Sequence, residues 1–228
     1  MTWQQDAKKR VALEAVKHVK DGFVVGLGSG STAAFAIQEL GKMIKQKNLH
    51  IMGVPSSSQA KILAVNSGIP LTTLDEHPVL DLAIDGADEV DKNLDMIKGG
   101  GGALTREKIV ASSAKQVIIV ADESKLADKL GKFKVPIEVL PFALAPVTNA
   151  IKDLGGKPFL RESKGKVGAV VTDNGNYILD VDFGLIDNTK ALDEKIKRIP
   201  GVIETGLFIG LANRVYLGKS DGIIQLKK

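Results

Sequence analysis

The segment Asp85–Lys108, DGADEVDKNLDMIKGGGGALTREK, places acidic residues, basic residues and four consecutive glycines between a buried strand and a helix. The apolar run Leu80–Ile84 precedes it, and the pattern after the glycines is helical. Gly99–Gly102 cost backbone entropy on folding and contribute no side-chain packing, so we expect a ligand to approach the backbone there. N–H groups at the start of a helix bind anions, which leaves the nearby carboxylates for proton transfer. The segment therefore predicts an anionic substrate and acid–base chemistry.

The same order of strand, polar turn and helix occurs earlier in the chain. Phe23–Gly28 is expected to be a short buried strand, Gly28–Thr32 a Gly/Ser turn, and 33–44 a helix. Repeated units of this kind predict a parallel sheet covered by helices, with a ligand crevice outside the carboxyl ends of the strands. The other elements expected in this part are strands at Leu49–Val54, Leu71–Leu74, Leu80–Ile84 and Gln116–Ala121, and helices at about 3–20, 59–67 and 103–114.

The character of the chain changes at Gly131–Pro141, where prolines punctuate a mixed stretch, as at a domain junction. Beyond it we expect a helix at 147–154, a hairpin of Val167–Thr172 with Tyr177–Val181 around an Asn-Gly turn, a helix at Ala191–Ile199, and strands at Val202–Phe208 and Arg214–Leu217 that return to the first unit. The predicted fold class is α/β, a Rossmann-like parallel-sheet domain covered by helices (1–130 plus 203–228) with a second, smaller α+β domain (131–202).

The Gly/Ser turn within GLGSGST (26–32) has two possible functions and one structural explanation. A dinucleotide site needs G-x-G-x-x-G and an acidic residue after the next strand, but the glycine spacing differs and the next strand ends in Pro55-Ser56-Ser57-Ser58. A Walker A loop needs Gly-Lys-Ser/Thr, which the turn lacks. What remains is a site for a small phosphate or a sugar hydroxyl, or mere N-capping of the helix by Ser31 or Thr32.

Glu107 falls on the side of the expected helix that carries small apolar residues. A carboxylate on a packed face is uncommon unless it is paired or used. If Glu107 lies over a partly desolvated cleft, burial raises its pKa toward the range of a general base. A structural salt bridge to a neighbouring Lys or Arg explains the position equally well.

Composition excludes several classes of function. The chain has 44% hydrophobic and 25% charged residues, as ordinary globular proteins do. Its net charge is only +4, its basic residues are mostly scattered, and 4% aromatic residues offer little surface for stacking bases, so nucleic-acid binding is not predicted. The absence of cysteine excludes disulfides, thiolate metal sites and a Cys nucleophile. His18, His50 and His77 lack the spacing of metal ligands, and no metal site is predicted.

Targeting signals are equally absent from the sequence. The first twenty residues are charged throughout, which argues against a signal peptide. No apolar run is long enough to cross a bilayer. We therefore expect no membrane association and a cytoplasmic location.

Six motifs along nearly the whole chain resemble ribose-5-phosphate isomerase of the A type. They are GLGSGSTAAF (26–35), DGADEVD (85–91), KGGGGALTREK (98–108), ADESK (121–125), VTDNGN (171–176) and PGVIETGLF (200–208). Their combination and order are specific, and no reactive position departs from the family pattern. The resemblance implies interconversion of D-ribose 5-phosphate and D-ribulose 5-phosphate in the non-oxidative pentose phosphate pathway, through an enediolate and without metal or cofactor.

The resemblance also implies roles for individual residues. Glu107 would be the base that moves a proton between C1 and C2. Asp85 would assist ring opening, with Asp88 nearby, and Lys98 would hold the developing enediolate oxygen. Further substrate contacts are implied for Ser29, Gly30, Ser31, Thr32, Gly86, Ala87, Gly99, Gly100, Gly101 and Lys125, with Lys125 as the phosphate partner. The resemblance thus implies that the protein binds a small sugar phosphate and forms a homodimer or a homotetramer.

Other functions compete with this one. A non-enzymatic sugar-phosphate sensor would keep the glycine-rich loops without needing Glu107, but it would carry a DNA-binding segment, and residues 1–20 are too short for a helix-turn-helix. A CoA transferase would use a glutamate nucleophile and a longer cleft. An amino-sugar-phosphate deaminase would more naturally involve a histidine, and none lies near a motif. A nicotinamide dehydrogenase is not predicted, because the glycines of the Gly/Ser turn lack the G-x-G-x-x-G spacing of a dinucleotide site.

Overall fold

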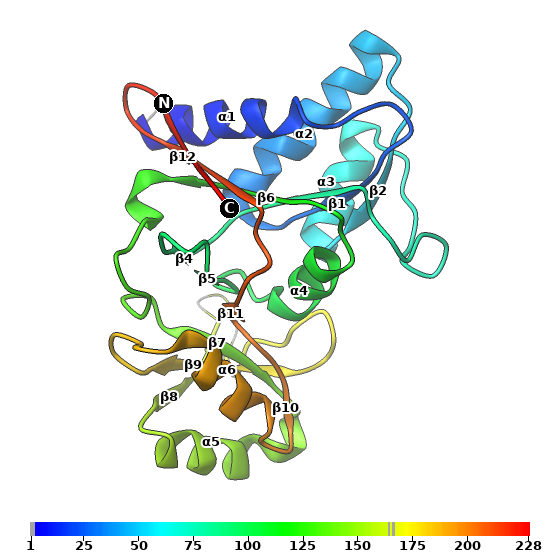
Figure 1. The fold of residues 1–228 in the computed structure, drawn as a ribbon. Helices are drawn as coiled ribbons and strands as arrows, with labels where there is room; N and C mark the ends of the chain where they lie inside the picture. Colours follow the sequence, from blue (N-terminus) through cyan, green and yellow to red (C-terminus); the bar gives the residue numbers. More distant parts are fainter. Residues whose placement is uncertain (1–2, 164, 166) are drawn as a thin grey trace.

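The computed structural model describes residues 3–163, 165 and 167–228. Within these ranges the strands form a six-stranded, a four-stranded and a three-stranded sheet, which we call the main, small and bridging sheets. The main sheet lies between helices in the upper part of Figure 1, and the small sheet lies below it. The α/β class expected from the sequence is confirmed.

The main sheet is mostly parallel. Its order is β13-β12-β6-β3-β1-β2, and only the pair β12–β13 at one edge is antiparallel. Its strands are β1 (Val24–Leu27), β2 (Met52–Pro55), β3 (Leu82–Asp85), β6 (Val117–Asp122), β12 (Arg214–Gly218) and β13 (Ile223–Lys227). Strands β1, β3 and β6 are buried along their whole length. Because both faces of a parallel sheet are covered, such strands are continuous apolar runs without alternation.

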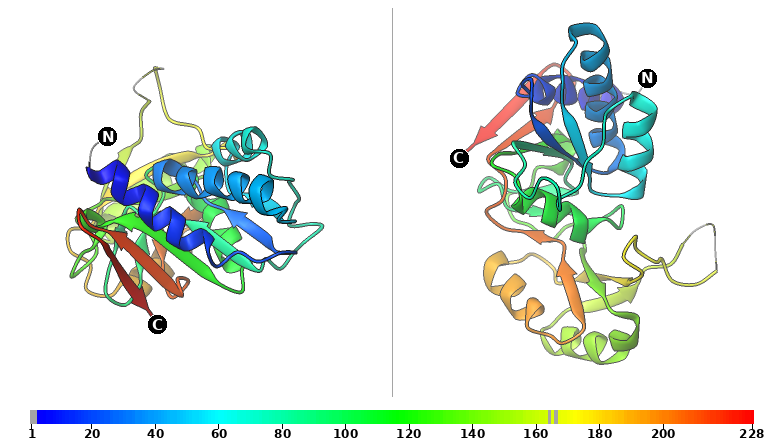
Figure 2. Two further views of the ribbon diagram at one scale, coloured as in Figure 1. Left: turned by 90° about the horizontal axis from the view of Figure 1, so that it is seen from above. Right: turned by 90° about the vertical axis from the view of Figure 1, so that its right-hand side faces the viewer.

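Helices cover the main sheet on both faces (Figures 1 and 2). Helices α1 (Trp3–Val16), α2 (Gly30–Lys47) and α3 (Ser58–Ser67) pack on one face, where Val25, Ile84 and Ile118 meet Leu40 of α2. On the other face, α4 (Leu104–Ser112) and the bridging sheet pack against Ile119. The bridging sheet consists of β4 (Glu89–Val90), β5 (Met96–Ile97) and β11 (Leu207–Phe208).

The small sheet is antiparallel, in the order β10-β7-β9-β8, and packs against α5 and α6 around its own apolar core. Its elements are β7 (Val135–Val139), β8 (Lys157–Leu160), β9 (Tyr177–Asp182), β10 (Val202–Thr205), α5 (Leu144–Asp153) and α6 (Thr189–Lys197), with short 3-10 turns at Pro141–Ala143 and, beside the main sheet, at Glu123–Lys125. Ile97 and Leu207 of the bridging sheet belong to this core, so the bridging sheet joins the two units.

Several expected elements differ from the structure. Leu71–Leu74 is not a strand, because only Leu71 bridges to Gly53 and the chain then turns. The expected hairpin strand Val167–Thr172 makes only isolated bridges, and β9 pairs instead with β8 and β7. The Asn-Gly turn exists, but the partner strand lies earlier in the chain. The Asn-Gly signal predicts where the chain reverses direction. It does not determine which strand pairs with β9 or in which register, because these depend on long-range packing.

Several boundaries also differ: α1 ends at Val16 and not near residue 20, and α5 and α6 begin two or three residues earlier than expected. Two further differences matter more. The helix after the Gly/Ser turn begins at Gly30 and not near Ala33, with Ser29 as its N-cap, so Ser31 and Thr32 lie in its first turn and do not cap it. Val202–Phe208 is split: β10 pairs with β7 in the small sheet, and only β11 returns to the bridging sheet. The sheets otherwise follow the expected division into 1–130 plus 203–228 and 131–202, which stays a prediction.

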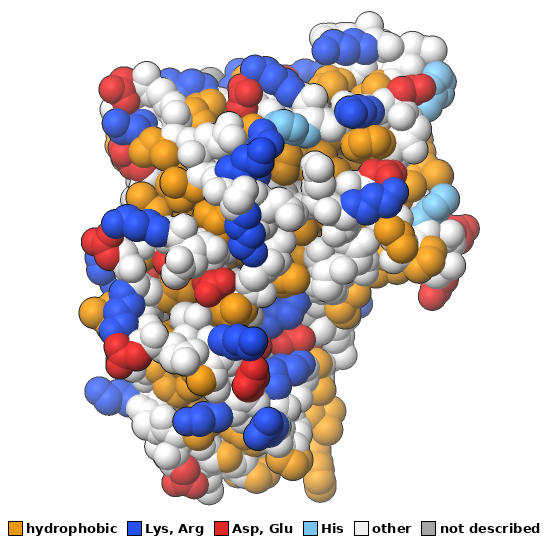
Figure 3. Space-filling model, viewed as in Figure 1, with side chains coloured by type: hydrophobic (Ala, Val, Ile, Leu, Met, Phe, Trp, Pro, Cys, Tyr) orange, Lys and Arg blue, Asp and Glu red, His pale blue; other side chains and the backbone are white. Residues whose placement is uncertain are grey.

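In the ranges that the structure covers, no helix is both long and apolar enough to span a bilayer. On the face shown in Figure 3, Lys and Arg side chains alternate with Asp and Glu over both units. The basic residues on this face therefore do not merge into one continuous patch, in agreement with the scattered distribution in the sequence.

We expect Leu40→Ala to lower the free energy of unfolding by about 2–5 kcal/mol, because Leu40 is 0% exposed between α2 and the main sheet and its truncation leaves a cavity. Ile62→Ala on α3 is the control: Ile62 is 63% exposed, so we expect a change within about 0.5 kcal/mol. Urea unfolding of both variants measures the difference, and equal effects would contradict the burial argument.

Candidate active site

A cavity of about 290 Å³ lies at the carboxyl ends of the main-sheet strands, between the two units. All the site residues expected from the sequence line it except Asp85 and Gly100. Those that line it are Ser29, Gly30, Ser31, Thr32, Gly86, Ala87, Asp88, Lys98, Gly99, Gly101, Glu107 and Lys125. The volume suits a small metabolite and is well below the size of a dinucleotide site.

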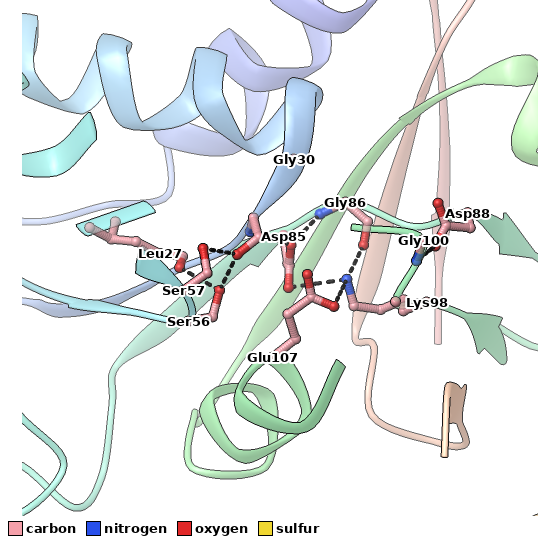
Figure 4. A network of polar contacts seen from close by, with 12 residues as sticks. Leu27, Gly30, Ser56, Ser57, Asp85, Gly86, Asp88, Lys98, Gly100 and Glu107 are labelled. Atoms are coloured by element: carbon pink, nitrogen blue, oxygen red, sulfur yellow. Dashed lines mark hydrogen bonds and ion pairs between the residues drawn. The ribbon is translucent and has the colours of Figure 1, made fainter. Parts of the chain in front are cut away.

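Asp85 ends β3 and lies just behind the cavity wall, where it is 5% exposed. Its Oδ1 accepts N–H bonds from Ser29 (3.0 Å) and Gly86 (2.7 Å), and its Oδ2 lies 3.1 Å from Lys98 Nζ (Figure 4). Gly28 makes this packing possible, since a Cβ at that position would lie 2.2 Å from Asp85 Oδ1. The Asp85 carboxylate therefore links the Gly/Ser turn to the DGAD segment.

Lys98 is the centre of the site and is only 3% exposed. Its ammonium donates to the Gly86 carbonyl (2.6 Å), pairs with Asp85, and lies 3.3 Å from Glu107 Oε2 (Figure 4). It also lies 5.3 Å from the centre of the Phe208 ring, a cation–π distance. Burial by itself lowers the pKa of Lys98, but the two carboxylates outweigh burial and raise it, so the side chain stays charged.

Glu107 is buried (5% exposed) and extends from the first turn of α4 toward Lys98 (Figure 4). Burial, aided by the charge of Asp85, raises its pKa to about 8, although Lys98 acts in the opposite direction. Its Oε2 has no hydrogen-bond partner among the described residues, because the approach of Lys98 is that of an ion pair and not of an aligned hydrogen bond. A desolvated carboxylate with an unsatisfied oxygen at a cavity wall has the properties of a general base.

The glycine loop is held from the outside by a residue that the sequence did not indicate. Arg161, paired with Asp180, donates to the carbonyls of Gly99 (2.9 Å) and Gly100 (3.1 Å). Since the C=O and N–H of a trans peptide point in opposite directions, the N–H groups of Gly100 and Gly101 point away from Arg161. Gly101 lines the cavity.

Gly100 makes a contact with Asp88 that the sequence did not indicate. Its N–H donates to Asp88 Oδ2 (2.7 Å), and a Cβ there would lie 2.7 Å from Asp88 Oδ1 (Figure 4). The bond holds the Asp88 carboxylate at the wall of the cavity. A direct contact of Gly100 with substrate stays a prediction and would require Asp88 to release this N–H.

Hydroxyl groups and a helix N-terminus form the opposite wall. Ser29 Oγ bonds Ser56 Oγ (2.9 Å) and Ser57 Oγ (2.6 Å), which joins the loops after β1 and β2 (Figure 4). Ser57 also caps α3, because its side chain accepts the Ala60 N–H (3.1 Å). Ser31 and Thr32 place the first turn of α2 at the cavity, where N–H groups and the helix dipole favour an anion.

Two lysines from distant segments approach this wall. Lys125 ends a short 3-10 turn after β6, and Asp122 caps this turn by accepting the Ser124 N–H (3.2 Å). Lys125 and Asp122 both line the cavity. Lys8 of α1 also lines it and donates to Ser31 Oγ (3.0 Å). The sequence analysis did not single out Lys8, because a lysine on an amphipathic helix gives no signal without the fold.

The small unit contributes the remaining wall through residues 170–173. Their motif, VTDNGN, belongs to the family pattern, but no contact had been expected from it. Within the described ranges, no three His, Asp or Glu side chains are arranged to hold a metal ion, and a reaction without metal or cofactor stays a prediction.

The fold and this carboxylate–lysine–carboxylate site define an α/β protein whose cavity is suited to acid–base chemistry on a small anionic ligand. The sequence profile of ribose 5-phosphate isomerase A (phosphoriboisomerase A) matches residues 52–222. The chain belongs to the ribose 5-phosphate isomerase A family, the enzymes that interconvert ribose 5-phosphate and ribulose 5-phosphate.

Relatives and solved structures agree with this assignment. Ribose-5-phosphate isomerase A of Methanothermobacter thermautotrophicus is 51% identical over 96% of this chain and 97% of its own. The structure of ribose 5-phosphate isomerase A from Methanocaldococcus jannaschii is 49% identical, with a TM-score of 0.94 over 98% of this chain and 99% of that chain. A D-ribose-5-phosphate isomerase in complex with phospho-erythronic acid is 44% identical, with a TM-score of 0.96 over 99% of both chains.

The raised pKa of Glu107 predicts how stability depends on pH. Between pH 5 and pH 8 the average protonation of Glu107 is higher in the native state than in the unfolded chain, because its pKa is raised to about 8 from an unfolded value near 4.5. Stability conferred by the bound proton is therefore lost as the pH rises through this window. Relative to Glu107→Gln, which cannot titrate, we expect the unfolding free energy of the wild type to fall by at least about 1 kcal/mol. Urea unfolding at both pH values tests this, and parallel pH dependence of the two proteins would contradict it.

Proposed function

We propose that this family member interconverts D-ribose 5-phosphate and D-ribulose 5-phosphate through an enediolate, with Glu107 as the general base. The observation that carries the proposal is the buried Glu107 carboxylate, whose Oε2 lies beside the Lys98 ammonium and has no hydrogen-bond partner in the described part of the chain. The raised pKa of Glu107 suits a general base, because proton abstraction is most effective when the pKa of the base lies near the working pH.

The proton balance of the reaction needs few groups. Glu107 takes the C2 proton of the open-chain aldose and returns it to C1, while a second proton moves from the C2 oxygen to the C1 oxygen. Negative charge that develops on the oxygens is stabilised by the Lys98 ammonium and by the Gly101 N–H, both at the cavity wall. Preorganised donors of this kind typically contribute about a hundredfold or more in rate.

The geometry supports different roles for the two aspartates. Asp85 already accepts two N–H bonds and pairs with Lys98, which suits a residue that fixes the ammonium. Asp88 lines the cavity and is held by Gly100, so it is the better placed group for ring opening and for proton movement between sugar oxygens. A related isomerase is known in complex with phospho-erythronic acid, whose planar carboxylate is similar to an enediolate.

We place the phosphate at the first turn of α2, between Lys8 and Lys125. The cavity there combines N–H groups of a helix N-terminus, the Thr32 hydroxyl and two ammonium groups. A phosphate bound there would be held by residues other than Glu107 and Lys98, so that its binding energy could position the reacting carbons.

We expect Glu107→Gln to lower kcat by at least about a thousandfold with little change in KM, because Gln keeps the shape of the side chain but cannot take the proton. The measurement is exchange of solvent deuterium into C1 or C2 of the two sugar phosphates by NMR, with EDTA-treated protein. Near-normal exchange would remove Glu107 from the mechanism.

The same experiment separates the enzyme from a sugar-phosphate sensor. The wild type should convert the substrate and incorporate label. Saturable binding without conversion or exchange would instead favour a binding protein. Neither binding nor conversion would show that the site takes another ligand.

We expect Lys125→Ala and Lys8→Ala to raise KM at least about tenfold while lowering kcat much less, because both remove charge at the phosphate end and not at the reacting carbons. Lys61→Ala, outside this cavity wall, is the control. A kcat-only effect in Lys125→Ala would contradict its role as a phosphate partner.

We also propose that the chain forms a homo-oligomer through the small unit. Large apolar side chains are exposed there, among them Phe142 (95%), Phe159 (51%) and Leu140 (42%). Orange side chains gather at the lower right of Figure 3, over this unit. Exposed apolar surface of this kind is typical of protein interfaces.

A further inference from the structure

Glu138, the penultimate residue of β7, is a completely buried carboxylate (0% exposed) that does not line the cavity. Four side chains donate hydrogen bonds to it. Thr172 Oγ1 (2.8 Å), Asn174 Nδ2 (3.0 Å) and Asn176 Nδ2 (2.8 Å) donate to Oε1, and Thr105 Oγ1 donates to Oε2. Because every one of these donors would be left unpaired by an apolar residue at this position, the cluster depends on the carboxylate.

The three donors to Oε1 belong to one turn of the small unit, residues 172–176. Thr172 Oγ1 accepts the N–H groups of Asn174 and Asn176, both at 3.2 Å. Thr172 and Asp173 line the cavity, and Asp173 Oδ2 accepts the Ser58 N–H (2.7 Å) at the start of α3. Through this turn Glu138 holds one wall of the cavity.

The fourth donor belongs to the helix that carries Glu107. Thr105 and Arg106 immediately precede Glu107 in the first turn of α4. Arg106 reaches the same turn, donating to Asn174 Oδ1 (2.7 Å) and to the Asp173 carbonyl (2.9 Å). The yellow segment after β8 accordingly lies beside α4 in Figure 1.

The start of α4 has no cap of its own. Its N-cap residue is Ala103, whose methyl side chain makes no capping hydrogen bond. When the N-cap side chain accepts no hydrogen bond, the N–H groups of the first helical turn have no capping partner within the helix. The position of the first turn therefore depends on tertiary contacts, and those of Thr105 and Arg106 lead to the small unit.

We propose that Glu138 is a positioning residue for the reaction: it ties the first turn of α4 to the 172–176 turn and so sets where Glu107 and the cavity wall lie. The role rests on the proposed function of Glu107 as the base. Glu107 Oε2 lies 3.3 Å from Lys98 Nζ, and the reacting carbon must fit beside this pair. A displacement of about 1 Å at such a site can cost on the order of a hundredfold in rate.

Thr105→Val is the decisive variant, because it removes the one hydroxyl that joins Glu138 to α4 and keeps the side-chain shape. We expect kcat to fall at least about tenfold with KM changed less than about threefold, and Thr105→Ser to restore kcat to within about threefold of wild type. Thr172→Val, which loosens the cavity wall, should act more on KM. All constants are measured well below the melting temperature of each variant.

Two controls separate positioning from stability. Thr148→Val removes a hydroxyl that donates to the Leu144 carbonyl in α5, outside the cavity, and should leave kcat and KM unchanged. Glu138→Gln offers an oxygen to the turn and an amide group to Thr105, and should keep kcat within about threefold. The pH dependence of kcat/KM should shift in Thr105→Val, because a displaced Glu107 meets Lys98 at a different distance, whereas lost stability alone would not shift it.

Wild-type kcat in Thr105→Val, or a loss no greater than that of Thr148→Val, would overturn the positioning role. So would a large loss in Glu138→Gln, since its hydrogen bonds are retained. Glu107→Gln is assayed in parallel. If it remains active, the assignment of the base fails and the positioning role fails with it, whereas an inactive Glu107→Gln beside a fully active Thr105→Val overturns the positioning role alone.

Discussion

The buried ammonium of Lys98 is the interaction on which the rest of the site depends. It lies between Asp85 and Glu107, and all three side chains are almost fully buried. Charges leave water only at considerable cost, so a buried group of this kind persists when each charge is paired. One cation faces two carboxylates, and Asp85 has the better satisfied oxygens. Glu107 is left with the weaker pairing, and burial accounts for its raised pKa.

The three charged groups come from three different elements. Asp85 ends β3, whereas Lys98 follows β5 and Glu107 lies in α4. Parallel strands bring their carboxyl ends to one edge, which is where open α/β sheets bind ligands. The close approach of Asp85 to Gly28 then joins the first two loops of this edge. The site thus combines the carboxyl edge of the main sheet with residues from the bridging sheet and α4.

The small unit supports two parts of the site, the glycine loop and the first turn of α4. Arg161 fixes the carbonyls of the glycine loop from behind, and the buried Glu138 cluster reaches the first turn of α4. Both contacts come from antiparallel strands or from the turns that follow them. The positions of Glu107 and of the glycine loop therefore depend on packing between two units that have separate cores.

The sequence by itself determined the α/β class and most strands of the main sheet, and nearly all the site residues that it predicted line the cavity. Local signals suffice for this, since apolar runs, glycines and acid–base motifs are contiguous in the chain. Only the tertiary structure decided that β9 pairs with β8, that Lys8 of α1 reaches Ser31, and that Arg161 and Glu138 support the site. These are contacts between residues far apart in the sequence, and their partners are chosen by packing. The same holds for Glu107: its helical face was evident in the sequence, but its pKa depends on a desolvation that only the folded chain creates.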